Sequence, residues 1–134
     1  MSTGKSRYFV SEVLINLGYE WTNIENDSTK ELYDNIIWKD DTNKATRTEF
    51  NNKMTEVQNN EALRILRQKR NKLLVDCDYL AMPDYPHSTD TIKQAWLTYR
   101  QALRDLPSTS SSQLGDYFET DFTLTNVTWP TPPS

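Results

Sequence analysis

The stretch between Thr46 and Met82 contains neither Gly nor Pro, and it constrains the fold more than any other feature of the chain. Thr46 and Glu49 have the spacing of a capping box, in which each side chain accepts a hydrogen bond from the other residue's backbone amide. Apolar residues then recur with helical spacing, namely Phe50, Met54, Val57, Leu63, Leu66, Leu73, Leu74 and Cys77. The pattern predicts one helix from Arg47 to about Tyr79, about 48 Å long at 1.5 Å per residue.

A second helix is predicted after the connector Met82–His87, whose two prolines block continuation of the first helix. Ser88 or Thr89 is placed to cap its start, and Pro107 is expected to end it. Its apolar stripe consists of Ile92, Trp96, Tyr99, Leu103 and Leu106. Because the connector is short, we expect the two helices to form an antiparallel hairpin. The predicted hairpin core contains Leu66, Leu73, Leu74, Cys77, Trp96, Tyr99 and Leu103.

The first 44 residues are predicted to form a small β-containing segment. The apolar run Tyr8–Leu17 suits either a helix or short strands, because both spacings occur in it. The runs Tyr19–Ile24 and Tyr33–Trp38 alternate aromatic or apolar residues with polar ones, which is typical of half-buried strands. We expect these two strands to pair as a hairpin.

The last 27 residues, 108–134, are predicted to form an extended, Pro-rich arm. A Ser/Thr-rich linker opens it, Tyr117–Val127 alternates like an exposed strand, and the terminal prolines cannot lie inside a helix or sheet. The predicted fold is therefore mainly α with minor β. It has three segments, at residues 1–44, 45–107 and 108–134.

Composition and charge exclude several classes of function. The net charge of −4 and the pI of about 5.0 argue against nucleic acid as a partner, because such proteins carry a basic domain or stripe. No apolar run approaches the roughly 18 residues of a membrane span, and the polar N-terminus lacks the apolar core of a signal peptide. We therefore expect a protein that is made and assembled in the cytosol, without membrane contact.

The residues that most often carry chemistry are few and scattered. His87 is the only histidine, and Cys77 is the only cysteine that could act as a nucleophile beside it. A buried cysteine and a solvated loop histidine explain both residues more simply. Four carboxylates surround the connector without forming a calcium-binding loop, namely Asp76, Asp78, Asp84 and Asp90. We predict that the chain is not an enzyme and has no catalytic, cofactor-binding or metal-binding residues.

A basic run on the first predicted helix contains Arg64, Arg67, Lys69, Arg70 and Lys72. It could contact a nucleic-acid backbone, but its members spread around the helix, which favours an ordinary solvated face. Arg100 and Arg104 on the second helix could pair with Asp76 or Asp78 near the connector, or with Glu61. Exposed pairs of this kind contribute roughly 0 to 1 kcal/mol, so we expect them to fix helix register more than stability.

Several segments together resemble a known family. In the run Leu63–Tyr79, the pair Arg70-Asn71 is followed by two leucines and then an Asp-aromatic pair. This run resembles the phage tail assembly chaperone and tail-fibre-associated family, and Trp96–Pro107 is very similar to the second helix of that family. Three shorter segments are also similar, namely Tyr33–Asp41, Ala45–Phe50 and Asn126–Pro133. Tyr79 and Ala45 depart from it mildly, because the family usually has Trp and often has Pro at these positions.

The resemblance covers most of residues 33–133 and implies a phage tail protein that acts through protein–protein contact. We expect a structural component of the tail, baseplate or fibre attachment that resides in the virion and is assembled in the host bacterial cytoplasm. Its partners would be other tail proteins or further copies of itself. A transient assembly chaperone absent from the virion is the alternative, and a nucleic-acid-binding regulator using the basic run is a remote one.

The resemblance and the aromatic content also indicate residues of interest for binding. Polar positions shared with the family motif are Arg70, Asn71, Arg100 and Arg104. Candidate partner contacts are the aromatic residues of the two ends, because aromatic side chains are enriched at interfaces. They are Trp21, Trp38, Tyr117, Phe118 and Trp129.

Trp96 provides a direct test of the predicted hairpin. Replacing it with alanine is expected to lower the free energy of unfolding by about 3–5 kcal/mol, because a large side chain is removed from the core. A urea titration followed by circular dichroism measures this loss. A loss under about 1 kcal/mol, which is normal for surface substitutions, would place Trp96 on the surface.

Overall fold

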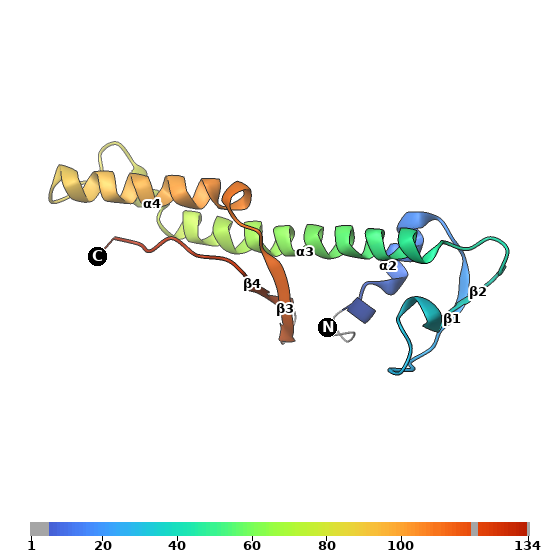
Figure 1. The fold of residues 1–134 in the computed structure, drawn as a ribbon. Helices are drawn as coiled ribbons and strands as arrows, with labels where there is room; N and C mark the ends of the chain where they lie inside the picture. The colour runs from blue at the N-terminus through green and yellow to red at the C-terminus, as the bar shows by residue number, and fades with distance from the viewer. Residues whose placement is uncertain (1–5, 119–120, 134) are drawn as a thin grey trace. The chain divides into compact units, whose positions relative to one another are not determined.

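The computed structural model describes residues 6–118 and 121–133, without the side chains of 117 and 118. The chain is mainly helical with small antiparallel sheets (Figure 1). In chain order the elements are α2 (Val10–Leu17), β1 (Trp21–Ile24), η1 (Tyr33–Asn35), β2 (Ile36–Trp38), α3 (Arg47–Asp76), η2 (Asp78–Ala81), α4 (Asp90–Thr109), β3 (Gln113–Phe118) and β4 (Asp121–Thr125). They form two compact units, and α3 contributes to both. Unit 1 comprises Met1–Glu61 and Asp116–Asp121, and unit 2 comprises Ala62–Gly115 and Phe122–Ser134.

The apolar run at the start of unit 1 is a helix. Val10, Val13 and Leu14 of α2 are buried at helical spacing. The helix ends at Gly18, whose φ of 81° is left-handed and therefore suits a residue without a side chain. The Gly18 amide donates to the carbonyls of Leu14 and Ile15, which satisfies the open end of the helix. These local signals decide between the two structures that the sequence left open.

The two predicted N-terminal strands pair antiparallel, with Trp21 opposite Trp38. The second strand is shorter than predicted, because its first residues form the 3-10 turn η1. Asn35 at the end of this turn is fully buried. Its side-chain amide donates to the carbonyls of Asp27 and Glu31, and its Oδ1 accepts from the Asp27 amide. One side chain therefore holds the loop between the strands.

The long helix α3 begins as predicted, at the capping box. The Glu49 amide donates to Thr46 Oγ1 at 3.1 Å, and the Thr46 amide donates to Glu49 Oε1 at 3.0 Å. The helix ends at Asp76, three residues before the predicted Tyr79. Cys77 leaves the helical conformation, with φ −121° and ψ 12°, and the chain continues as the short 3-10 helix η2.

The second helix of the hairpin, α4, is capped by Thr89, whose Oγ1 accepts from the Ile92 amide at 3.2 Å. The prediction that Pro107 ends this helix is wrong, because α4 continues to Thr109. A proline takes away one amide donor and crowds the preceding turn, but its fixed φ is compatible with helix. The turn beyond it is closed by the Ser110 amide, which donates to the Leu106 carbonyl at 3.0 Å.

The predicted extended arm also differs from the structure, because residues 108–134 include the last part of α4 and the strands β3 and β4. Thr125 Oγ1 donates to the Gln113 carbonyl, and Asn126 donates to the Ser111 carbonyl at 2.8 Å. The described residues after Asn126, 127–133, have neither helix nor strand. The alternation read in the sequence as one exposed strand thus belongs to a hairpin of two strands.

Asn35 is expected to determine the stability of unit 1. Replacing Asn35 with alanine removes three hydrogen bonds from a fully buried site, which should lower the free energy of unfolding by about 2–4 kcal/mol. Urea unfolding monitored by tryptophan fluorescence measures the change. Asn52, which is exposed on α3, provides the control, and Asn52→Ala should change the midpoint little. Equal midpoints for the two variants would contradict this role for Asn35.

Candidate interaction surfaces

The core of unit 2 lies between the end of α3 and the middle of α4. Cys77, Leu80, Tyr99 and Leu103 are buried there. The partly buried residues packed against them are Leu73, Leu74, Tyr85, Trp96 and Trp129. Leu66 is also fully buried, about two turns before Leu73 on α3. Because Trp96 is only partly buried, the loss expected for Trp96→Ala moves to the lower end of the range given above.

Arg100 connects the two helices of this hairpin. Its guanidinium donates to the Leu74 carbonyl at 2.9 Å, to Cys77 Sγ at 3.0 Å and to Asp78 Oδ1 at 2.7 Å. Burial by itself lowers the pKa of Arg100, but the bonds to Asp78 and Cys77 outweigh it and raise the pKa overall. Of the carboxylates that the sequence offered to Arg100, the structure selects Asp78.

The other arginine of the family motif on α4 behaves differently. Arg104 is exposed and donates to Gln101 Oε1 at 3.0 Å. Arg70 on α3 donates to Asn71 Oδ1 at 2.9 Å and to the backbone carbonyl of Arg104 at 3.4 Å. The pairs 70–104 and 74–100 run in opposite directions along the two helices, so the hairpin is antiparallel. In Figure 1, α4 lies beside the last part of α3.

Cys77 and His87 bond to different groups. Cys77 Sγ donates to the Leu73 carbonyl at 3.2 Å, while His87 Nε2 lies 2.8 Å from the Leu80 carbonyl. Within residues 6–118 and 121–133, no group of three or more His, Cys, Asp or Glu side chains is placed to hold a metal ion. The absence of catalytic activity remains a prediction.

The aromatic residues proposed as partner contacts lie in different surroundings. Trp38 is half-buried and its ring lies 6.1 Å from that of Tyr19 and 5.9 Å from that of Tyr33. Trp21 is half-buried on the paired strand β1. Trp129 packs against the core of unit 2. Tyr117 and Phe118 belong to β3, but their side chains lie outside the described residues.

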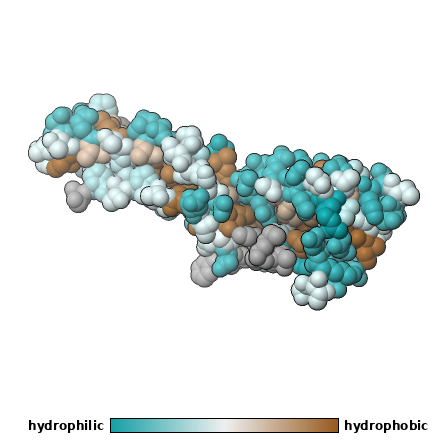
Figure 2. All heavy atoms as spheres, in the orientation of Figure 1, coloured by the Kyte–Doolittle hydropathy of each residue, from teal (hydrophilic) through white to brown (hydrophobic). Residues whose placement is uncertain are grey.

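Sequence reasoning missed the most exposed apolar side chains. In unit 2 these are Val75, Tyr79 and Met82, which are 67%, 56% and 56% exposed. In unit 1, Ile15 and Ile37 are 68% and 42% exposed. Figure 2 shows hydrophobic residues in brown among the hydrophilic teal of the surface. Val75 could have been found from the sequence, because it directly follows the partly buried Leu73 and Leu74 and falls on another face of α3.

Residues 63–134, which include the whole hairpin core, match the family described as phage tail assembly chaperone protein. The chain belongs to this family. Its role is therefore related to the assembly of phage tails. No curated protein and no solved structure matches the chain. The similarity of Tyr33–Asp41 and Ala45–Phe50 to the family lies outside the matched residues and stays a prediction. No helix in the described part of the chain has the length and apolar character needed to cross a membrane.

Arg100 is expected to stabilise unit 2 by more than an exposed ion pair. Only 9% of it is exposed, and its removal leaves the Leu74 carbonyl and Cys77 Sγ without that donor. Arg100→Met should therefore lower the free energy of unfolding by about 1–3 kcal/mol. Arg104→Met, on the exposed face of the same helix, is the matched control and should change it by less than about 0.5 kcal/mol. The idea fails if urea unfolding gives the two variants the same stability.

Proposed function

We propose that this chain is a structural component of the phage tail, baseplate or fibre attachment, and that it acts through contact with other tail proteins. The proposal places it in the virion after assembly in the host cytoplasm. Its support is one observation. Each of the two compact units carries its own exposed large apolar side chains, and such surface residues mark sites of protein contact when they gather.

Two separate sets of exposed apolar residues suit a component that joins neighbours. Unit 1 presents Ile15 and Ile37, and unit 2 presents Val75, Tyr79 and Met82. A protein that remains in an assembly gains from contacting two partners at once, because each contact raises the effective concentration for the other. Copies of the chain itself are among the partners that this arrangement would accept.

The same proposal holds that the chain is not an enzyme. A cleft of unit 1 beside α3 is lined by Leu32, Tyr33, Phe50 and Met54 together with polar residues. Glu31 is the only titratable carboxylate in that lining, and it forms an ion pair with Arg47. An active site needs titratable groups poised to transfer protons or to attack a substrate, and this cleft offers none that is not already paired.

The alternative is a transient assembly chaperone, which the description of the matched family favours. Such a protein would bind a tail component during assembly and leave before the virion is complete. Exposed apolar residues suit this role as well, so only the fate of the chain separates the two functions.

Mass spectrometry of purified virions distinguishes the two functions. A structural component should be present at a fixed number of copies per particle after density-gradient purification. A transient chaperone should be present in the infected-cell lysate together with tail intermediates and absent from the particle. Absence from the virion would reject the structural role and leave the chaperone role.

The exposed apolar residues of unit 2, here called the exposed corner, provide a test by substitution. Changing Val75, Tyr79 and Met82 together to serine should abolish incorporation into particles, because an apolar contact is lost, while the urea midpoint of the isolated protein changes little. Gln94→Ser on exposed α4 is the control and should incorporate normally. Normal incorporation of the triple variant would show that this corner contacts no partner.

A further inference from the structure

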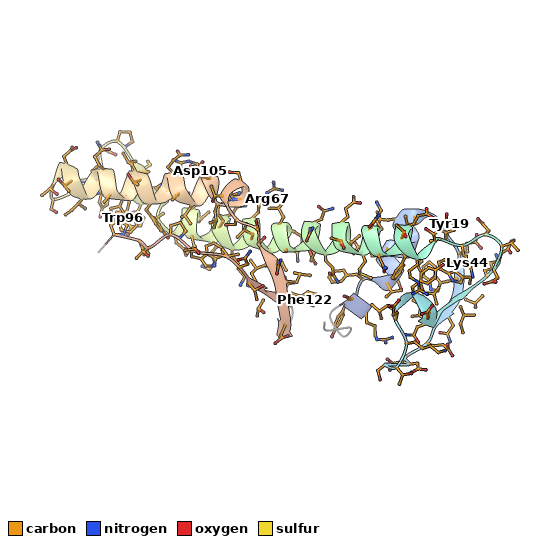
Figure 3. All side chains as sticks on the ribbon, in the orientation of Figure 1. Tyr19, Lys44, Arg67, Trp96, Asp105 and Phe122 are labelled. Atoms are coloured by element: carbon orange, nitrogen blue, oxygen red, sulfur yellow. The ribbon has the colours of Figure 1, made fainter. Side chains whose placement is uncertain are left out.

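Arg67, Arg70 and Arg104 form a cluster within unit 2, here called the arginine face. Arg67 and Arg70 lie one turn apart on α3, where side chains three positions apart are neighbours. Arg70 reaches across to the backbone carbonyl of Arg104 on α4, at 3.4 Å. Figure 3 labels Arg67 on α3. The Arg70 guanidinium therefore lies beside the Arg104 backbone where the two helices meet, and Arg67 is one turn away from Arg70 on the same helix.

The arginine face lacks a carboxylate partner within the described part of the chain. Arg70 and Arg104 bond only to neutral acceptors, namely Asn71 Oδ1, Gln101 Oε1 and a backbone carbonyl. The nearest carboxylate in sequence, Asp105, accepts from the Gln101 amide instead. None of the three arginines takes part in an ion pair in residues 6–118 and 121–133.

A shortage of carboxylates does not explain why the arginine face lacks ion pairs. The chain has 19 acidic and 15 basic residues. Ion pairs engage Lys30, Lys39, Lys44, Arg47, Lys53, Lys72 and Arg100. Like charges one helical turn apart repel each other. The arginine face therefore carries positive charge that an external anion would stabilise.

We propose that the arginine face binds a carboxylate-rich segment of a partner protein. Guanidinium groups suit this partner, because each can donate two parallel hydrogen bonds to one carboxylate. Groups on both helices allow such a segment to lie across the seam of the hairpin. The inference rests on the proposed role in protein contact and assigns to it one surface and one class of partner.

A nucleic acid is the competing anion, and the charges disfavour it. Specific binding to a phosphate backbone draws on many cationic contacts, and its strength falls steeply with salt. The arginine face supplies three such groups on a chain whose net charge is −4. A long polyanion would therefore meet repulsion beyond this face, whereas a short acidic segment would not.

Fluorescence anisotropy with a labelled oligoglutamate peptide tests the inference on the full chain at low salt. Changing Arg67, Arg70 and Arg104 together to glutamine should weaken binding about tenfold or more. The three positive charges would attract the acidic peptide and pair with its carboxylates, and glutamine does neither. Added salt should weaken binding by the intact chain.

Lys69→Gln is the matched control. Lys69 is exposed on the same helix and also lacks an ion pair among the described residues, but it points about 200° away from Arg67 around the helix axis. Its loss should leave peptide binding within about twofold of the intact chain. Urea unfolding of every variant separates a loss of binding from a loss of fold.

Three outcomes would overturn the inference. They are no binding of the peptide by the intact chain, an equal loss in Lys69→Gln, and tighter binding of a labelled oligothymidylate that the triple variant also loses. The last outcome would assign the face to nucleic acid. Peptide binding is measured without the virion, so its failure and the failure of the structural role are separate results.

Discussion

The helical hairpin depends on how Arg100 terminates α3. The last carbonyls of a helix have no partner within it and must find donors elsewhere. Here the Leu74 carbonyl accepts from the Cys77 amide and from Arg100, and the Leu73 carbonyl accepts from Cys77 Sγ. Asp78, just beyond the helix, forms an ion pair with Arg100. A single side chain of α4 thus ends one helix and fixes the position of the other.

Signals that act over a few residues were predictable from the sequence. The capping box at Thr46, the cap at Thr89 and the pairing of the two N-terminal strands are present as predicted. The caps depend on side chains that bond to nearby backbone amides. The strands depend on the alternation of apolar and polar residues, because successive side chains of a strand point to opposite faces. Family membership could also be predicted, because the family motif in Leu63–Tyr79 is a short run of residues that the sequence shows directly.

Features that depend on contacts distant in sequence were not predictable. The end of α3 at Asp76 follows from Arg100 and Cys77 together, and no pattern within α3 marks it. In the sequence, Asn35 is indistinguishable from an ordinary turn residue. Only the structure shows that it is buried and that its side chain bonds to the loop before it. The error at Pro107 has another origin. A proline inside a helix takes away a single amide donor, and here the turn beyond it is still closed by the bond from the Ser110 amide to the Leu106 carbonyl.

The buried Arg100 and the exposed Arg104 of the hairpin are linked by their positions on α4. Arg100 and Arg104 are one turn apart on α4, so the bonds that hold Arg100 against Leu74 also place the Arg104 backbone opposite Arg70. Arg100 is buried and has a carboxylate, whereas Arg104, Arg67 and Arg70 have none among the described residues. The same contacts that join the two helices therefore also place Arg70, which has no carboxylate partner among the described residues, at their seam. A rigid scaffold that presents preorganised charge loses little freedom on binding, which is the physical advantage of placing such a surface on paired helices instead of on a loop.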